Sequence, residues 1–189
     1  MRFNGHDITR AKPADIAKKG VVRSFQISAV FPHLTVIENV RVALQATSPM
    51  VFHFWRSTRE LDHLNERALE LVEAVGLSPY ARTLAVELSY GRKRALEIAT
   101  TLALDPELML LDEPTQGMGH EDVGRIIDLI RRIREGRTIL MVEHNMSVVA
   151  DLSDTITVLQ RGQILAEGPY ATVSKDPAVI EAYMGTDHG

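Results

Sequence analysis

Two adjacent carboxylates, Asp112 and Glu113, come directly after four consecutive apolar residues in the segment Leu108–Thr115. An apolar run of this length, bounded by prolines at positions 106 and 114, favours a central parallel strand buried on both faces. Such a strand delivers both acids to the crevice beyond the sheet edge, where α/β proteins bind ligands. One acid can then hold a magnesium ion while the other orients the water that attacks a phosphate. The alternative is an ordinary buried strand that ends in a solvated turn.

A second candidate site lies at Ser89 and Gly91, where the pattern predicts the start of a helix. The unpaired N–H groups and the dipole at a helix N-terminus attract phosphate. Glycine also lets the backbone approach a ligand closely. The alternative is a plain helix cap, for which Ser89 is equally suitable.

Two more polar residues follow predicted strands, namely Gln26 and His144. The neutral amide of Gln26 can bind magnesium or the attacking water, and its alternative is an ordinary polar residue at a strand end. A histidine that ends a strand is usually structural, so His144 gains a functional interpretation only from its neighbours.

The surrounding pattern predicts the elements that would position these residues. The helix Glu121–Arg134 and the apolar strand Thr138–Val142 follow the central strand, which indicates a strand–helix–strand crossover with two parallel strands. The sequence also predicts a strand at Val21–Gln26 and hairpins at Arg2–Thr9 and 155–167. Helices are expected at Pro13–Lys19, from a capping box of Thr35 and Glu38 onward, and at Thr58–Val75, Ser89–Leu104 and Pro177–Met184.

The connector Ala46–Ser57 carries three aromatic residues, Phe52, Phe54 and Trp55. We interpret them as a satellite core. The alternative is an exposed contact surface for a partner helix.

Composition narrows the class of protein. The 189 residues fit one domain, or one domain with a small lobe, and 45% are hydrophobic. A formal charge of −4 and a pI near 6.0 give no reason to expect nucleic-acid binding. There is no cysteine, hence no disulfide or thiolate chemistry. With no apolar run near the roughly 18 residues of a membrane span and no signal-peptide core, we expect a soluble intracellular chain.

Taken in order, Gln26, Leu88–Gly91, Asp112-Glu113 and His144 resemble the motifs of the ATP-binding cassette (ABC) ATPases of membrane transporters. The resemblance runs nearly end to end. It is closest to the ATP-binding subunits of branched-chain amino acid importers and their relatives for amides and urea. The stretches that carry this closer likeness are Arg23–Gln26, Leu34–Val40, Gly117-Met118, Val142–Met146 and Leu165–Pro169.

The resemblance implies an α/β fold: a P-loop NTPase-like ABC ATPase domain with a mostly parallel central sheet. Residues 1–189 would form part of that domain. A helical signature subdomain would cover about 27–104, and 105–189 would run from the Walker B strand to the C-terminal part of the catalytic core.

The resemblance also implies a role for each matched residue. ATP and Mg²⁺ would be the cofactors, with Asp112 and Gln26 as magnesium ligands. Glu113 would position the lytic water, and His144 would hydrogen-bond the γ-phosphate and that water. Four residues of the signature would face the ATP of the other subunit in a head-to-tail dimer: Ser89, Tyr90, Gly91 and Arg92. Gly117 and Met118 would belong to the loop Gln116–Gly119, which crosses the dimer interface.

Two departures from the family pattern stand out. The signature usually reads Leu-Ser-Gly-Gly-Gln, whereas Tyr90 and Arg92 stand in its third and fifth positions here, and Arg92 adds a positive charge near the phosphate end. The sequence also contains no Gly-x-x-x-x-Gly-Lys-Ser/Thr loop and no upstream aromatic to stack on adenine. We therefore expect an N-terminal truncation that removes the P-loop strand and helix. Weak ATP binding by the chain alone, uncovered apolar surface and marginal solubility would follow.

The function that the resemblance implies is the energy-coupling ATPase subunit of an amino acid importer, peripheral on the cytoplasmic face of the cell (inner) membrane. Its partners would be a second ABC ATPase subunit, two transmembrane permease subunits and, indirectly, a solute-binding protein. One alternative is a catalytically impaired partner that donates only Ser89 and Gly91 to a composite ATP site. Another is a cassette protein of translation or DNA repair, which would favour two cassettes or a long coiled-coil insertion, and neither is visible.

Overall fold

A computed structural model of the 189-residue chain describes residues 1–24, 30–47 and 58–184. The chain divides into two compact units, residues 1–142 and 143–189. The predictions for Gln26 and for the aromatic residues of the connector lie outside the described residues.

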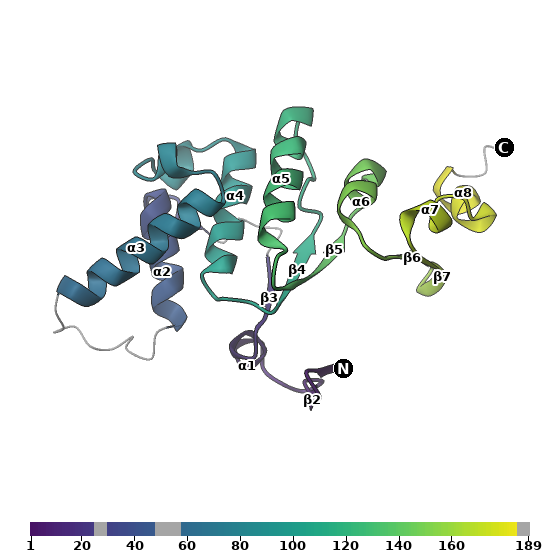
Figure 1. The fold of residues 1–189 in the computed structure, drawn as a ribbon, viewed down its shortest axis with the longest axis horizontal. Helices are drawn as coiled ribbons and strands as arrows, with labels where there is room; N and C mark the ends of the chain where they lie inside the picture. The colour runs from purple at the N-terminus through teal and green to yellow at the C-terminus, as the bar shows by residue number, and fades with distance from the viewer. Residues whose placement is uncertain (25–29, 48–57, 185–189) are drawn as a thin grey trace. The chain divides into compact units, whose positions relative to one another are not determined.

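Three parallel strands form the sheet of the first unit (Figure 1). They are β3 (Val21–Arg23), β4 (Leu108–Asp112) and β5 (Thr138–Val142), in the order β3-β4-β5. The central place of β4 and the parallel crossover to β5 confirm the prediction. Met109 and Leu111 are buried, but Leu108 and Leu110 on the opposite face are only half-buried. Full burial on both faces, which the apolar run predicted, is therefore wrong for this strand.

Apolar side chains lie open on β5. Leu140 and Val142 are each 60% exposed, and within the described part of the chain β5 pairs with β4 alone. Uncovered apolar surface is thus present, as expected; the marginal solubility that would follow from it stays a prediction.

Helices fill the described chain between β3 and β4. They are α2 (Val36–Thr47), α3 (Thr58–Ala74) and α4 (Tyr90–Leu102), with the short 3-10 helices η1 (Ser78–Tyr80) and η2 (Ala85–Glu87) between the last two. The three helices pack on one another, and α4 and α3 also contact α5 (His120–Ile133), the crossover helix between β4 and β5 (Figure 1). This arrangement agrees with a helical subdomain, whose limits near 27 and 104 stay a prediction.

The start of α2 forms the capping box that the sequence predicted. The backbone N and the Oγ1 of Thr35 each donate to Glu38 Oε2 at 2.7 Å, and Glu38 N donates back to Thr35 Oγ1 at 3.4 Å. Asn39, which is 2% exposed, adds a second set of side-chain hydrogen bonds. Its Nδ2 donates to the carbonyls of Phe31, Leu34 and Thr35, and its Oδ1 accepts from Phe31 N. This side chain therefore fixes the preceding loop onto the helix.

The core of the first unit lies between these helices and the sheet. One apolar stripe on each helix supplies it, as expected for amphipathic helices. Its most deeply buried side chains include Val36, Val40, Val72, Leu77, Leu96, Ile98, Met109, Leu111 and Leu129.

A hairpin and a short helix precede β3. Strands β1 (Arg2–Phe3) and β2 (His6–Asp7) pair antiparallel around Asn4 and Gly5, whose φ values are +46° and +79°. Two consecutive positive φ angles are what a tight Asn-Gly hairpin turn requires. Helix α1 (Pro13–Lys18) begins with proline and is followed by Gly20 at φ +91°. Both elements confirm the predictions.

The second unit contains α6 (Met146–Leu152), the antiparallel hairpin β6 (Ile156–Gln160) and β7 (Gln163–Gly168), α7 (Tyr170–Val173) and α8 (Pro177–Met184). The hairpin turns at Arg161 and Gly162, with φ of +52° and +79°. The hairpin and α8 were predicted, whereas α6 and α7 were not. In the described ranges, no helix of either unit combines the length and apolarity needed to cross a bilayer.

Candidate functional site

The two predicted carboxylates lie at the carboxyl end of β4, and Asp112 is held by two arginines. Its Oδ2 accepts a hydrogen bond from Arg23 Nη2 at 2.7 Å, across from the end of β3. Its backbone carbonyl accepts from Arg94 Nη2 of α4 at 2.8 Å. Neither arginine was singled out as a site residue by the sequence, because Arg23 is 89 positions from Asp112 and Arg94 donates to a backbone carbonyl.

Glu113 has a left-handed backbone, with φ of +43°. Its N–H donates to Val142 O at 2.8 Å, and its carbonyl accepts from Gln116 N at 3.1 Å. A positive φ is uncommon for a residue other than glycine, and such strain gathers at functional sites. The chain therefore leaves the sheet in a sharp turn directly at the predicted catalytic glutamate.

The chemistry of this end of β4 suits a magnesium site completed by other groups. Within the parts of the chain that the structure describes, no cluster of three or more acidic, histidine or cysteine side chains could hold a metal alone. Magnesium is usually bound through one or two carboxylates, with water and substrate phosphate filling its other positions. Asp112 can supply one such carboxylate, with its Oδ2 shared with Arg23. The second predicted ligand, Gln26, lies outside the described residues.

Ser89 stands at the N-cap position of α4, as predicted, but it does not cap with its side chain. Its backbone is extended (φ −62°, ψ 162°), and its Oγ makes no capping hydrogen bond. The side chain is exposed. Because the N–H groups of a first helical turn need partners outside the helix, this end of α4 is suited to an anion.

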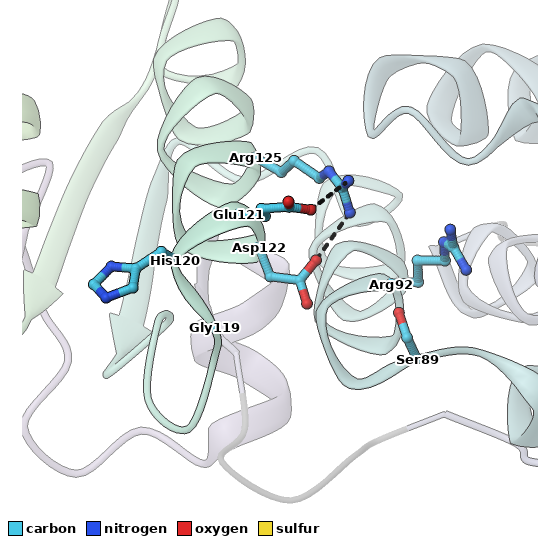
Figure 2. A pocket seen from close by; sticks show the side chains of 7 residues that line it. All are labelled: Ser89, Arg92, Gly119, His120, Glu121, Asp122 and Arg125. Carbon is cyan, nitrogen blue, oxygen red and sulfur yellow. Dashed lines mark hydrogen bonds and ion pairs between the residues drawn. The ribbon is translucent and has the colours of Figure 1, made fainter.

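Gly91 is buried against Asp122 of α5. A Cβ atom at position 91 would lie 2.7 Å from Asp122 Cγ, closer than real side chains allow. Asp122 is in turn held by Arg125 at 3.0 Å, and Arg125 also lies 3.6 Å from Glu121 (Figure 2). The close packing of the first turns of α4 and α5 thus requires glycine at position 91, whether or not a ligand binds there.

A pocket of about 480 Å³ opens where these two helix starts meet. Figure 2 shows Asp122 and Arg125 pointing toward α4, whereas His120 points away from it. The pocket is lined by Ser89, Arg92, Gly119, His120, Glu121, Asp122 and Arg125.

Arg92 packs on an aromatic ring. The centre of its guanidinium lies 4.0 Å from the centroid of the Tyr80 ring in η1, a cation–π contact. The positive charge of Arg92, which departs from the usual signature sequence, therefore contacts a ring in the segment that connects α3 to α4.

Tyr90 and the loop Gln116–Gly119 lie side by side. An ideal Cβ on Gly117 would be 3.9 Å from Tyr90 Cε1, and Gly117 has a φ of +73°. Tyr90 is 56% exposed. Met118, which is half-buried, donates its N–H to Thr115 O at 3.3 Å. The structure thus places Gly117 beside the start of α4.

His144 belongs to the second unit. It is exposed, and its N–H donates to Glu143 Oε2 at 3.0 Å. The following Asn145 caps α6, because its Oδ1 accepts from Ser147 N at 3.1 Å. Contact of His144 with a γ-phosphate stays a prediction.

Models of known protein families match both ends of the chain. A family model described as "ABC transporter" matches residues 1–116. A second, described as "Branched-chain amino acid ATP-binding cassette transporter", matches residues 163–189.

Two relatives show how far the likeness extends. The high-affinity branched-chain amino acid transport ATP-binding protein BraF of Pseudomonas aeruginosa is 35% identical, over 98% of this chain and 75% of its own length. The corresponding protein LivG of Escherichia coli is 37% identical, over 90% of this chain and 69% of its own.

Solved structures give the same result. An ATP-binding cassette of an ABC transporter in its ADP conformation matches with a TM-score of 0.78 at 30% identity, over 97% of this chain and 75% of that one. A nucleotide-free ATP-binding cassette from an ABC transporter matches with a TM-score of 0.77 at 30% identity, over 97% and 76%.

Proposed function

Since the chain belongs to the ATP-binding cassette transporter family, we propose that it is the ATP-binding and ATP-hydrolysing subunit of an importer for branched-chain amino acids or related amides or urea. Relatives named for branched-chain amino acid transport support this substrate class. The same names argue against a role in translation or DNA repair.

The observation that carries the proposal is the turn at the end of β4. There Asp112 ends a central parallel strand and a strained Glu113 follows it, in the position where α/β proteins bind ligands. Asp112, with Gln26, would hold the magnesium ion that neutralises phosphate charge. Glu113 would orient the attacking water, and His144 would hydrogen-bond the γ-phosphate.

The start of α4 supports a dimer in which two nucleotides are shared. Ser89 has no capping bond, so the N–H groups behind it can receive phosphate. In the proposed head-to-tail dimer, Ser89, Tyr90, Gly91 and Arg92 face ATP held by a second ATPase subunit. Gly117 and Met118 lie in the loop that would cross the interface.

The proposed complex also contains two permease subunits, with a solute-binding protein acting through them. The chain would sit peripherally on the cytoplasmic face of the inner membrane, since the importer's permeases span that membrane.

A second candidate function is a partner that donates only the start of α4 to a composite site. The uncapped Ser89, at a helix start that can receive a phosphate bound to another subunit, supports this function as well as the first. In that case Glu113 would have no nucleotide to act on within its own chain.

One experiment separates these functions. The chain is mixed with a relative that carries the phosphate loop, and phosphate release is measured with Ser89→Arg and Glu113→Gln variants of this chain. If the chain hydrolyses ATP itself, both substitutions lower the turnover that this chain adds, Glu113→Gln by about 10²-fold or more. If it donates only its helix start, Ser89→Arg alone lowers turnover. If neither variant changes turnover, both functions are rejected.

A further inference from the structure

Arg94 is a buried cation that the proposed chemistry does not use. It lies early in α4 and is 7% exposed. Its Nη1 lies 2.6 Å from Glu97 Oε2 on the same helix, and Glu97 is 6% exposed. Its Nη2 reaches out of the helix to the backbone carbonyl of Asp112, at 2.8 Å. One guanidinium therefore joins α4 to the end of β4.

The acceptor of that bond belongs to the peptide group between Asp112 and Glu113. The carbonyl end of this peptide accepts from Arg94, while its N–H end, on Glu113, donates to Val142 O of β5 at 2.8 Å. A peptide group is planar, so two bonds on opposite ends fix the orientation of its plane. That orientation helps set the φ of Glu113, which is +43°.

We propose that Arg94 is a positioning residue that orients the Asp112–Glu113 peptide and thereby ties the start of α4 to the two carboxylates. The consequence for the ATPase rests on the proposed function. In the proposed dimer, Ser89 at the start of α4 faces the nucleotide of the partner, whereas Glu113 acts on the nucleotide of its own chain. Arg94 would then link the two ATP sites, because a shift of α4 on one nucleotide would move the glutamate that serves the other.

The competing explanation is an ion pair that only stabilises the fold. A single substitution cannot decide, since removal of one partner leaves a buried charge and destabilises strongly. Replacement of both partners by apolar residues of similar size is often neutral for stability. The double variant Arg94→Met, Glu97→Met therefore removes the bond to Asp112 together with both charges of the Arg94–Glu97 pair.

The test is amide hydrogen exchange of the chain measured by NMR. In the double variant we expect the amides of Glu113 and Gln116, which lie in the turn, to exchange about tenfold faster or more. The amides of Met109 and Leu111 in the middle of β4 should keep their wild-type rates. Arg67→Met is the matched control, because Arg67 pairs with Glu70 at the same helical spacing and a distance of 2.7 Å on the exposed side of α3. It should leave both sets of rates unchanged.

A folded double variant whose turn amides exchange at the wild-type rate would overturn the proposal. If the double variant does not fold, Arg94→Lys answers the same question, since lysine keeps the charge but not the forked pair of donors. Unchanged turn amides in that folded variant would also overturn it.

The link between the two ATP sites is tested by measuring the turnover of the double variant mixed with the relative that carries the phosphate loop. We expect kcat to fall while the KM for ATP stays constant. Absence of turnover with the wild-type chain would reject the proposed function and leave the exchange result to decide the role of Arg94.

Discussion

Arg23 and Asp112 face each other across the carboxyl ends of β3 and β4, with Nη2 and Oδ2 2.7 Å apart. The arginine side chain is 59% exposed and the aspartate side chain 24%. The carboxylate that the family motif assigns to magnesium thus already has a cation beside it. A metal ion would have to share Asp112 with Arg23 or displace it.

Replacement of Arg23 by alanine is therefore expected to strengthen metal binding. An ion pair of this exposure is worth about 0.2–1 kcal/mol, so Mn²⁺ affinity in the presence of ATP should rise by no more than about fivefold. The measurement is a Mn²⁺ titration followed by electron paramagnetic resonance. Arg67→Ala, which breaks an exposed pair on α3, is the control. Weaker metal binding by the Arg23 variant would contradict the idea that Arg23 and the metal ion compete for Asp112, and it would assign Arg23 a role in the metal site.

Gly91→Ala is expected to destabilise the first unit, because the new Cβ would meet Asp122 Cγ at 2.7 Å. Overpacking of this kind costs about 1–3 kcal/mol. Urea unfolding measures the loss. The control is Gly124→Ala, in the helix α5 that also carries Asp122, because a Cβ atom at position 124 would meet no atom within 4 Å. Alanine there should stabilise α5 by about 1 kcal/mol. A second substitution, Asp122→Gly, should restore part of the stability lost at position 91.

Arg92→Gln replaces the unusual fifth signature residue by the usual one. Loss of the contact with Tyr80, at 4.0 Å, should lower the free energy of unfolding by about 0.5–1 kcal/mol. A double-mutant cycle with Tyr80→Leu isolates the pair. A coupling energy of zero would show that the guanidinium gains nothing from the ring.

The capping box predicts a specific pH dependence. The hydrogen bonds from the Thr35 side chain and backbone, with a smaller contribution from Arg41, hold the pKa of Glu38 below its ordinary value of 4.5. Because the folded pKa is the lower one, Glu38 contributes stability above pH 4.5 and loses it as the pH falls through the folded pKa. In Glu38→Gln, unfolding free energy should therefore fall less steeply with acid than in the wild-type chain. Thr35→Val should do the same; an unchanged slope in both variants would contradict the assignment.

Self-association is expected through β5, where Leu140 and Val142 are exposed. Leu140→Thr keeps a residue suited to strands but removes apolar surface. Analytical ultracentrifugation should show a shift toward monomer at equal concentration. The exposed Leu69 of α3 offers a control, Leu69→Thr, that should not change the association. Equal association in wild type and Leu140→Thr would place the contact elsewhere.

Local patterns predicted most elements well. The bounds of β5 and α8 match the prediction residue for residue, because an apolar run and a proline mark their limits. The short helix α6 was missed, since its seven residues follow a strand almost directly and hold too few turns for a helical period. Its cap, Asn145, was the one local signal that could have found it.

The candidate site was predictable only in part. Asp112, Glu113 and Ser89 stand where the motifs place them, at a strand end and a helix start. The contacts that hold them were not visible, because Arg23 is separated from Asp112 by 89 positions and Arg94 donates to a backbone carbonyl. No pattern of side-chain types marks a carbonyl as an acceptor. The pairing of β3 with β4 decides the first contact, and the position of α4 beside the end of β4 decides the second.

The left-handed backbone of Glu113 sets folding and chemistry against each other at one position. A residue with a Cβ atom costs about 1–2 kcal/mol in that conformation, and glycine would avoid most of the penalty. A library of position 113 selected for folding alone should therefore enrich glycine and asparagine. The same library selected for solute uptake should return glutamate, so the two selections would enrich different residues at position 113.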